Sequence, residues 1–196
     1  MSRPLPATPR RADARQNVEK ILDAAIDCLS RNSEASVVQI ARAAGVGRVT
    51  LYGHFPSRDS LVEAALARLL AQGDEVLAGL DLSGDPRAAL EAFIQSSWLL
   101  TAQSSAVLEA AQAVLPRARI HALHARPEQR VRDLIVRGQN EGVFRTDLPA
   151  DWLASALHHL LKGTAADVAN GTLAPDDAPR FLAQMALAAY TPVPAT

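Results

Sequence analysis

The sequence predicts an all-α fold of about nine helices. Of the 196 residues 48% are hydrophobic but only 4% aromatic, so Ala, Leu and Val supply most of the apolar mass. That mixture favours helices, because strands rely on β-branched and aromatic side chains. Apolar residues also recur at helical spacing, as in the series Val18, Ile21, Leu22, Ala25 and Leu29. No segment of useful length alternates between apolar and polar residues.

The helical spacing of apolar residues in the first predicted helix starts at about residue 15, and the next helix begins at Ser36. Gln39 stands three residues after Ser36, the spacing of a capping box in which each side chain bonds the other's backbone N–H. This helix ends near residue 44, where Gly45 favours the left-handed conformation that stops a helix. A second short helix follows over 48–55, Pro56 breaks it, and a longer helix is expected over 57–79.

The second half opens with a change of composition over 79–86. Asp85-Pro86 is a good helix start, because proline suits the first helical position. Further helices are expected over 86–102, 104–115, 127–141, 150–170 and 175–190, with a less regular stretch over 116–127. The predicted domains are a flexible tail over 1–9, an N-terminal domain over 10–80 and a helical domain over 81–196.

Two short helices joined by a glycine turn, with a supporting helix on each side, predict a helix-turn-helix. The second helix must be held rigidly if it is to enter the major groove of DNA, and Ile40, Val46 and Leu51 would form the small core that holds it. Its outer face is expected to carry the hydrogen-bonding side chains Arg48, Thr50, Tyr52 and His54. Helical hairpins with a glycine turn also occur in proteins that never bind DNA.

The stretch from Ser36 to Leu61 closely resembles the N-terminal domain of tetracycline-repressor-type (TetR family) regulators. It contains the IA-x-x-AGV turn and the T-L-Y-x-H-F helix, followed by Pro-Ser-Arg. The preceding Ile21-Leu-Asp-Ala-Ala25 matches as well, so the resemblance covers about residues 15–65. The joint Arg31–Ala35 departs from the family, because it lacks the glycine-aromatic turn that many members have. The later resemblance is weaker and rests on Gly138–Gly142 through Leu148-Pro149.

The resemblance implies a sequence-specific transcriptional repressor that a small hydrophobic effector releases from a palindromic operator in double-stranded DNA. The residues implied to contact DNA are Ser36, Arg48, Thr50, Tyr52, His54 and Arg58. Arg48 and Thr50 would approach base edges or adjacent phosphates, and the other four would contact phosphates. Arg48 could instead be a solvated surface charge and Tyr52 a packing residue. An activator, or a constitutive architectural DNA-binding protein without a ligand, stays open as an alternative.

The C-terminal two-thirds would be a ligand-binding domain through which the chain forms a homodimer. The expected dimer interface is the apolar face formed by Trp152, Leu153, Leu157, Leu160, Leu161, Phe181, Leu182 and Met185. The candidate effector pocket is lined by Phe93, Ser97, Trp98, Gln103, Val107, His121 and His124. An ordinary intramolecular core is the alternative for both sets. No metal site is expected, because Pro127 interrupts the spacing of the histidines with Glu128.

Charge and motifs limit the remaining classes. The net charge is −1, but residues 1–60 hold 9 Lys and Arg against 6 Asp and Glu, while the rest hold 11 against 15. The single cysteine, Cys28, excludes an intrachain disulfide framework. No phosphate loop, nucleophile elbow or HExxH helix is present, so neither an enzyme nor a cofactor is expected. A cytoplasmic protein without membrane contact is expected, because no apolar run suits a membrane span or secretory signal.

Overall fold

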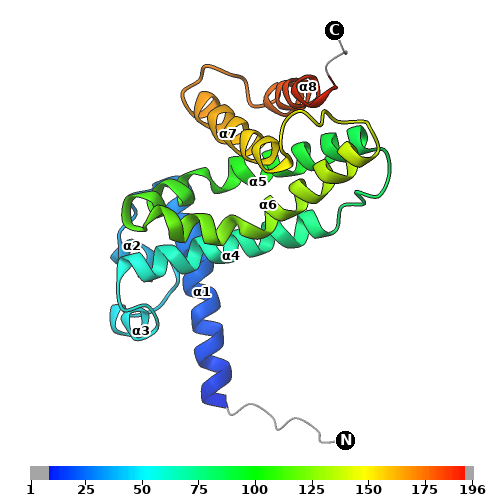
Figure 1. Cartoon of the computed structure of the whole chain (residues 1–196). Helices are drawn as coiled ribbons and strands as arrows, with labels where there is room; N and C mark the ends of the chain where they lie inside the picture. Colours follow the sequence, from blue (N-terminus) through cyan, green and yellow to red (C-terminus); the bar gives the residue numbers. More distant parts are fainter. Residues whose placement is uncertain (1–8, 193–196) are drawn as a thin grey trace, which may run out of the picture. The chain divides into compact units, whose positions relative to one another are not determined.

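A computed structural model describes residues 9–192, with side chains from Asp13 onward, and within that range it contains helices and no strand. The helices are α1 (Pro9–Arg31), α2 (Val37–Ala43), α3 (Arg48–His54), α4 (Arg58–Ala78), α5 (Pro86–Val114), α6 (Arg117–Asn140), α7 (Ala150–Ala169) and α8 (Ala178–Tyr190) (Figure 1). The predicted all-α class is confirmed, and eight helices in the described range are close to the expected nine. The helix α1 begins at Pro9, earlier than the apolar pattern indicated, and the rest of the predicted tail lies outside the described residues. Between residues 9 and 192, no helix is both long and apolar enough to cross a membrane.

The chain divides into two compact units. The first contains the residues up to Leu69 together with Ala106–Arg117, and the second contains Leu70–Ser105 and the residues from Ala118 onward. Both α4 and α5 therefore contribute residues to each unit. The functional division into residues 10–80 and 81–196 stays a prediction.

The first unit is built around the apolar faces of α1 and α4. Its fully buried residues, at 0% exposure, include Ile21, Ala25, Leu29, Ile40, Leu51, Leu61, Val62, Ala65, Leu66, Val107 and Ala111. On the surface, Arg68 of α4 forms ion pairs with two acidic residues of α1, Glu19 and Asp23, the latter at 2.9 Å from Nη2 to Oδ1. The helix α2 packs against α1, and α3 packs against α2.

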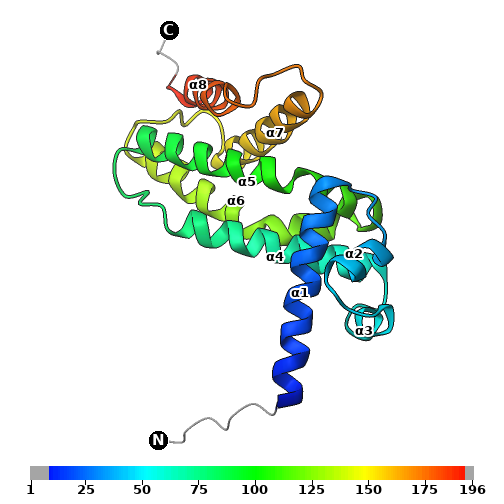
Figure 2. The same ribbon diagram turned by 180° about the vertical axis from the view of Figure 1, so that it is seen from behind.

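The second unit has its own apolar core, in which α7 and α8 lie side by side (Figure 2). Tyr190, at the end of α8, is 1% exposed and donates a hydrogen bond of 2.5 Å from its hydroxyl to the carbonyl of Leu153 in α7. Its ring meets Phe144 edge to face, with ring centroids 5.9 Å apart. Burial raises the pKa of the Tyr190 hydroxyl. These contacts fix α8 against α7 and against the turn that precedes α7.

Two predicted interruptions are wrong. The chain continues as helix through Gln103, because the hydroxyls there bond within the helix: Thr101 Oγ1 donates to the carbonyl of Ser97 at 2.7 Å, and Ser105 Oγ to that of Ala102 at 3.2 Å. Such bonds satisfy polar side chains without ending a helix. Residues 117–127 of the second stretch are also helical, and Pro127 lies inside α6. Pro127 lacks the N–H that would bond the carbonyl one turn earlier, and its ring crowds that carbonyl, but the helix continues past it.

Candidate nucleic-acid interface

The helix α2 begins with the capping box that the sequence predicts. The backbone N–H of Gln39 donates to Ser36 Oγ at 3.3 Å, and the backbone N–H of Ser36 donates to Gln39 Oε1 at 2.8 Å. Each bond satisfies an N–H that has no partner within the helix. Ser36 is exposed. Its structural role is thereby confirmed, while its contact with a DNA phosphate stays a prediction.

Gly45 ends α2 and turns the chain toward α3. Its φ of +66° is the left-handed conformation expected from the sequence. The N–H of Gly45 donates to the carbonyl of Arg42 at 3.2 Å, and that of Val46 to the carbonyl of Ala41 at 3.0 Å. This pair of bonds is the Schellman motif, which closes the end of a helix and sets the direction of the next segment. The turn therefore fixes the angle between α2 and α3.

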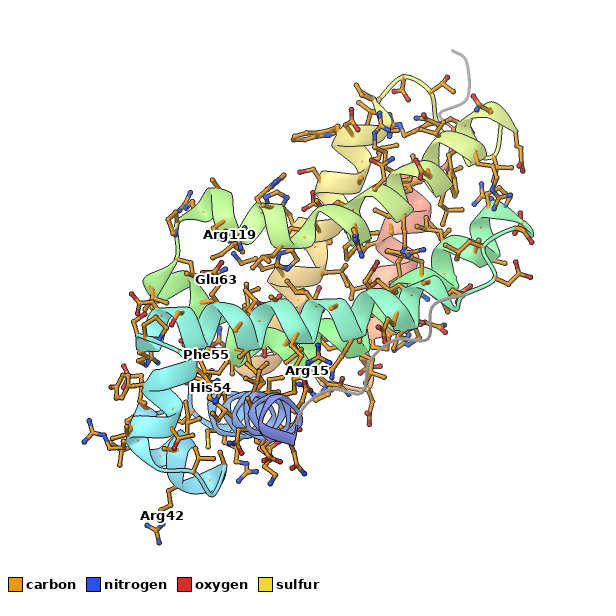
Figure 3. The ribbon with its side chains drawn as sticks, turned by 90° about the horizontal axis from the view of Figure 1, so that it is seen from below. Arg15, Arg42, His54, Phe55, Glu63 and Arg119 are labelled. Carbon is orange, nitrogen blue, oxygen red and sulfur yellow. The ribbon has the colours of Figure 1, made fainter. Side chains whose placement is uncertain are left out.

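The helix α3 is anchored by Leu51, which is fully buried. Around it, Arg48, Thr50 and Tyr52 are exposed and His54 is half-buried. All four side chains thus lie outside the core on a short helix held by α2, as the prediction requires. In Figure 3, α3 lies beside α2, and His54 and Phe55 mark where α3 gives way to α4. Phe55 is buried at 8% exposure and ends the helix in an extended conformation.

Arg58, at the start of α4, makes intramolecular bonds that sequence reasoning missed. Its guanidinium donates from Nη2 to the carbonyl of Ser33 at 2.8 Å and from Nε to that of Ala35 at 3.5 Å. Both carbonyls belong to the joint between α1 and α2, where the glycine-aromatic turn of many TetR members is missing. Arg58 therefore fastens this joint to α4. Its phosphate contact stays a prediction, and because a guanidinium has five N–H donors, the two bonds leave donors for it.

Sequence reasoning also passed over three exposed residues of the helix-turn-helix. Val49 of α3 is 88% exposed, and Gly53 of the same helix is exposed as well. Arg42, in the last turn of α2, is exposed and projects away from the ribbon in Figure 3. Val49 and Gly53 have no hydrogen-bonding side chain, and Arg42 lies on α2, so a pattern of hydrogen-bonding residues on α3 includes none of them. The sequence signal for Val49 and Gly53 is their position two residues before and after Leu51, which places both nearly opposite it on a helical wheel.

The candidate effector residues do not all come together. Phe93, Ser97 and Trp98 lie in the core of the second unit, at 3%, 7% and 7% exposure. The Ser97 hydroxyl oxygen is buried without a hydrogen-bond partner, which is unusual because a buried polar group normally has one. His124 is half-buried in the same unit, whereas Gln103 and His121 are exposed. Val107 is fully buried in the first unit.

His124 meets a second histidine that the prediction did not include. The ring centroids of His124 in α6 and His158 in α7 are 5.6 Å apart, edge to face. Burial lowers the pKa of His158 below its ordinary value of 6.5, and the nearby charges of His124, His159 and Lys162 lower it further, against the opposing effect of Glu128. Within the part of the chain that the structure describes, no group of three or more His, Cys, Asp or Glu side chains is placed to hold a metal ion.

The lowered pKa of His158 predicts a stability that falls with acidity. The folded state binds a proton at His158 less readily than the unfolded state does. Well above pH 6.5 neither state is protonated there, so stability is unaffected, and as the pH falls below 6.5 the unfolded state is increasingly favoured. We expect His158→Gln to lose less thermal stability than the unaltered chain between about pH 7.5 and about pH 5.5. Thermal unfolding of both proteins across this range measures it, and equal losses would contradict it.

The predicted dimer face separates into buried and exposed members. Leu153, Leu157, Leu161 and Leu182 are 8% exposed or less and pack in the core of the second unit, and Leu160 is half-buried against that core. Three large apolar residues remain outside it: Trp152 at 62% exposure, Phe181 at 39% and Met185 at 60%. The guanidinium of Arg180 lies 4.6 Å from the centre of the Phe181 ring. We call Phe181 and Met185, which stand four residues apart on α8, the exposed apolar face.

The N-terminal part of the chain matches a family of known proteins, whereas similarity to solved structures extends over most of the chain. Residues 21–65 match the family described as bacterial regulatory proteins, tetR family. This match contains all of α2 and α3, the C-terminal half of α1 and the start of α4, which are the elements that build the helix-turn-helix. No curated protein matches the chain.

Solved structures are similar over nearly the whole chain. One is described as a TetR-family transcriptional regulator from Rhodococcus sp., with 22% identity over 89% of this chain and 98% of its own, and a TM-score of 0.76. A transcriptional regulator from Saccharomonospora viridis in complex with choline shares 25% identity over 86% and 94%, with a TM-score of 0.74. The regulator FadR from Bacillus subtilis, in complex with stearoyl-CoA, shares 17% over 87% and 98%, also at 0.74. The resemblance to the TetR family is thus confirmed: the N-terminal region matches the family itself, and the chain has the fold of TetR-family transcriptional regulators.

Proposed function

We propose that the chain is a sequence-specific DNA-binding transcriptional regulator that acts as a homodimer. The observation that carries this proposal is the geometry of α3. It is a short helix whose one buried residue, Leu51, holds it against α2, while its remaining surface lies outside the core. Such a helix fits the major groove, about 12 Å wide, and the groove is where all four base pairs are distinguishable. Residues 1–60 hold more basic than acidic residues, which supports a DNA contact in this N-terminal part of the chain.

A second copy of the chain is the proposed occupant of the exposed apolar face. Phe181 and Met185 stand four residues apart on α8 and therefore share one side of that helix, and both are exposed. Adjoining exposed apolar side chains of this kind are typical of an interaction site when they form part of a larger apolar patch. One helix-turn-helix also buries too little surface for tight specific binding, so two copies on half-sites about 34–36 Å apart are expected.

We further propose a repressor that a small hydrophobic effector releases from a palindromic operator. The effector would enter among the helices of the second unit, where the unpartnered Ser97 hydroxyl offers a polar group within an apolar core. Support comes from the similar structures that hold choline and stearoyl-CoA. These two ligands differ so much in charge and size that they do not define the effector. Release requires that the effector bind the DNA-free state more tightly, and a 100-fold preference corresponds to about 2.7 kcal/mol.

The helix α4 is the proposed connection between effector and DNA, since its residues up to Leu69 belong to the first unit and those after it to the second. The chain would act in the cytoplasm, by binding rather than catalysis. A constitutive architectural protein would instead bind DNA with strong salt dependence and little sequence preference. An activator would bind an operator equally well but raise transcription, which a reporter assay distinguishes from repression.

Arg48→Ala tests the proposed base contact. If Arg48 reads a base edge, the substitution costs about 1–3 kcal/mol of operator binding and relaxes specificity at one base position. Titration of the variant against the operator and its single-base variants measures both effects. Arg126→Ala is the matched control, because Arg126 is also an exposed arginine but lies in α6. An equal loss on every sequence would reassign Arg48 to a phosphate.

A further inference from the structure

The side of α3 that faces most directly away from the protein is formed by Val49 and Gly53. Successive residues of an α-helix are turned by about 100°, so the residues two before and two after Leu51 are each about 160° from it. Those residues are Val49 and Gly53. Leu51 is fully buried and defines the inward direction. Any surface that meets α3 head-on therefore meets these two residues first.

The hydrogen-bonding side chains lie on the two flanks of this face. On the same wheel, Arg48 and Tyr52 lie about 60° and 100° from Leu51 on one side, and His54 and Thr50 lie equally far on the other. The exposure of each residue agrees with its position, since Tyr52 is 40% exposed and Val49 88%. The outward face thus has an apolar centre between polar edges.

Val49 is poorly suited to an exposed helix by its own properties. Its β-branched side chain loses rotamer freedom in a helix, and at 88% exposure it gains almost nothing from packing. Gly53 is also poorly suited to an exposed helix. A Cβ placed on it would meet nothing within 4 Å, so packing does not require a glycine, and glycine is the weaker helix former. Neither residue is explained by the stability of the domain itself.

We propose that Val49 reads the 5-methyl group of a thymine in each operator half-site and that Gly53 leaves the space for this approach. In the major groove the 5-methyl of thymine is the one apolar group that a base pair presents, and apolar side chains are its natural contact. An isopropyl group at the centre of the outward face is matched to that group, while the flanks remain for polar contacts. The inference rests on the proposed function and adds a specificity residue to it.

Operators that contain uracil test the inference directly, because uracil differs from thymine only by the missing methyl. Each thymine of a half-site selected from random duplexes is replaced in turn, and affinity is measured for the unaltered chain and for Val49→Ala. At one position we expect about a fourfold loss for the unaltered chain, which corresponds to about 0.8 kcal/mol for one methyl-sized group. Replacement in both half-sites should cost about 15-fold. In Val49→Ala the same replacement should cost less than about twofold.

The matched control is Val76→Ala, since Val76 is also an exposed valine, at 53%, but lies on α4. It should keep the full uracil penalty. Gly53→Ala supplies a second readout: it should raise the melting temperature of the free protein and weaken binding to the operator on the order of tenfold. A uracil penalty that is absent from the unaltered chain, or equal in Val49→Ala, overturns the inference while leaving the proposed function intact. Absence of any selected operator overturns both.

Discussion

Met185→Glu is expected to convert the protein to a monomer and to weaken operator binding by about a thousandfold or more. Met185 is 60% exposed on α8, so one chain accepts a carboxylate there without burying it. In a two-fold symmetric dimer the same position occurs twice, and two carboxylates would be removed from water without a partner. Such burial costs several kcal/mol per ion, and about 4 kcal/mol corresponds to a thousandfold change in affinity.

Sedimentation analysis and operator titration at equal protomer concentrations measure the two effects of Met185→Glu. Val76→Glu is the control: it places the same charge on another exposed apolar position, of 53% exposure, on α4. We expect this control to remain dimeric. If Met185→Glu stays dimeric and binds the operator with unchanged affinity, the exposed apolar face is not the interface.

Gly138→Ala is expected to cost about 3 kcal/mol of folding stability, at the upper end of the usual cost of overpacking. A Cβ on Gly138 would lie 2.5 Å from Cε2 and 2.9 Å from Cγ of Phe144, and carbon atoms do not approach so closely. Phe144 is 1% exposed and packs against Tyr190, so its ring can move away from a Cβ at position 138 only by disturbing that packing. For a chain of this length the melting temperature should fall by roughly 10 °C.

Thermal and urea unfolding of Gly138→Ala measure this cost at a fixed protomer concentration. Gly163→Ala is the matched control, because Gly163 also lies within a helix and a Cβ there would meet nothing within 4 Å. It should raise stability slightly, by about 0.5–1 kcal/mol. Adding Phe144→Leu to Gly138→Ala should recover part of the loss. An unchanged melting temperature for Gly138→Ala would show that the ring of Phe144 yields easily.

The helix-turn-helix was predictable because its signals are local. The capping box of Ser36 with Gln39 and the left-handed turn at Gly45 depend only on neighbouring residues, and both are confirmed. The start at Asp85-Pro86 is of the same kind: Asp85 Oδ2 accepts the backbone N–H of Ala88 at 3.0 Å. Short-range hydrogen bonds of the backbone can thus be predicted directly from the residue types.

The two predicted helix interruptions were wrong because they depended on the local propensity of single residues, which does not decide whether a long helix continues. Thr101 and Ser105 are weak helix formers, but their hydroxyls bond carbonyls of their own helix. Pro127 is a helix breaker by propensity, yet α6 continues past it. Propensity is a small term that packing of a long helix overrides.

The candidate sites depend on three-dimensional placement, which one sequence does not contain. An apolar face on α7 is broad enough to serve a core and an interface together, and only burial separates Leu157 from Trp152. Similarly, Val107 and Phe93 lie on one helix but belong to different units. The intramolecular bonds of Arg58 could not be predicted from the sequence, because they reach 23 and 25 residues back along the chain.

Selection of bound fragments from a random duplex library, at about physiological salt, tests the central claim most directly. The full chain is incubated with the library, and the retained fragments are sequenced over successive rounds. The proposed function predicts an enriched inverted repeat whose half-sites are centred about 34–36 Å apart, or a multiple of that distance. A folded dimer that enriches no sequence, or that retains all fragments equally, would contradict a sequence-specific regulator.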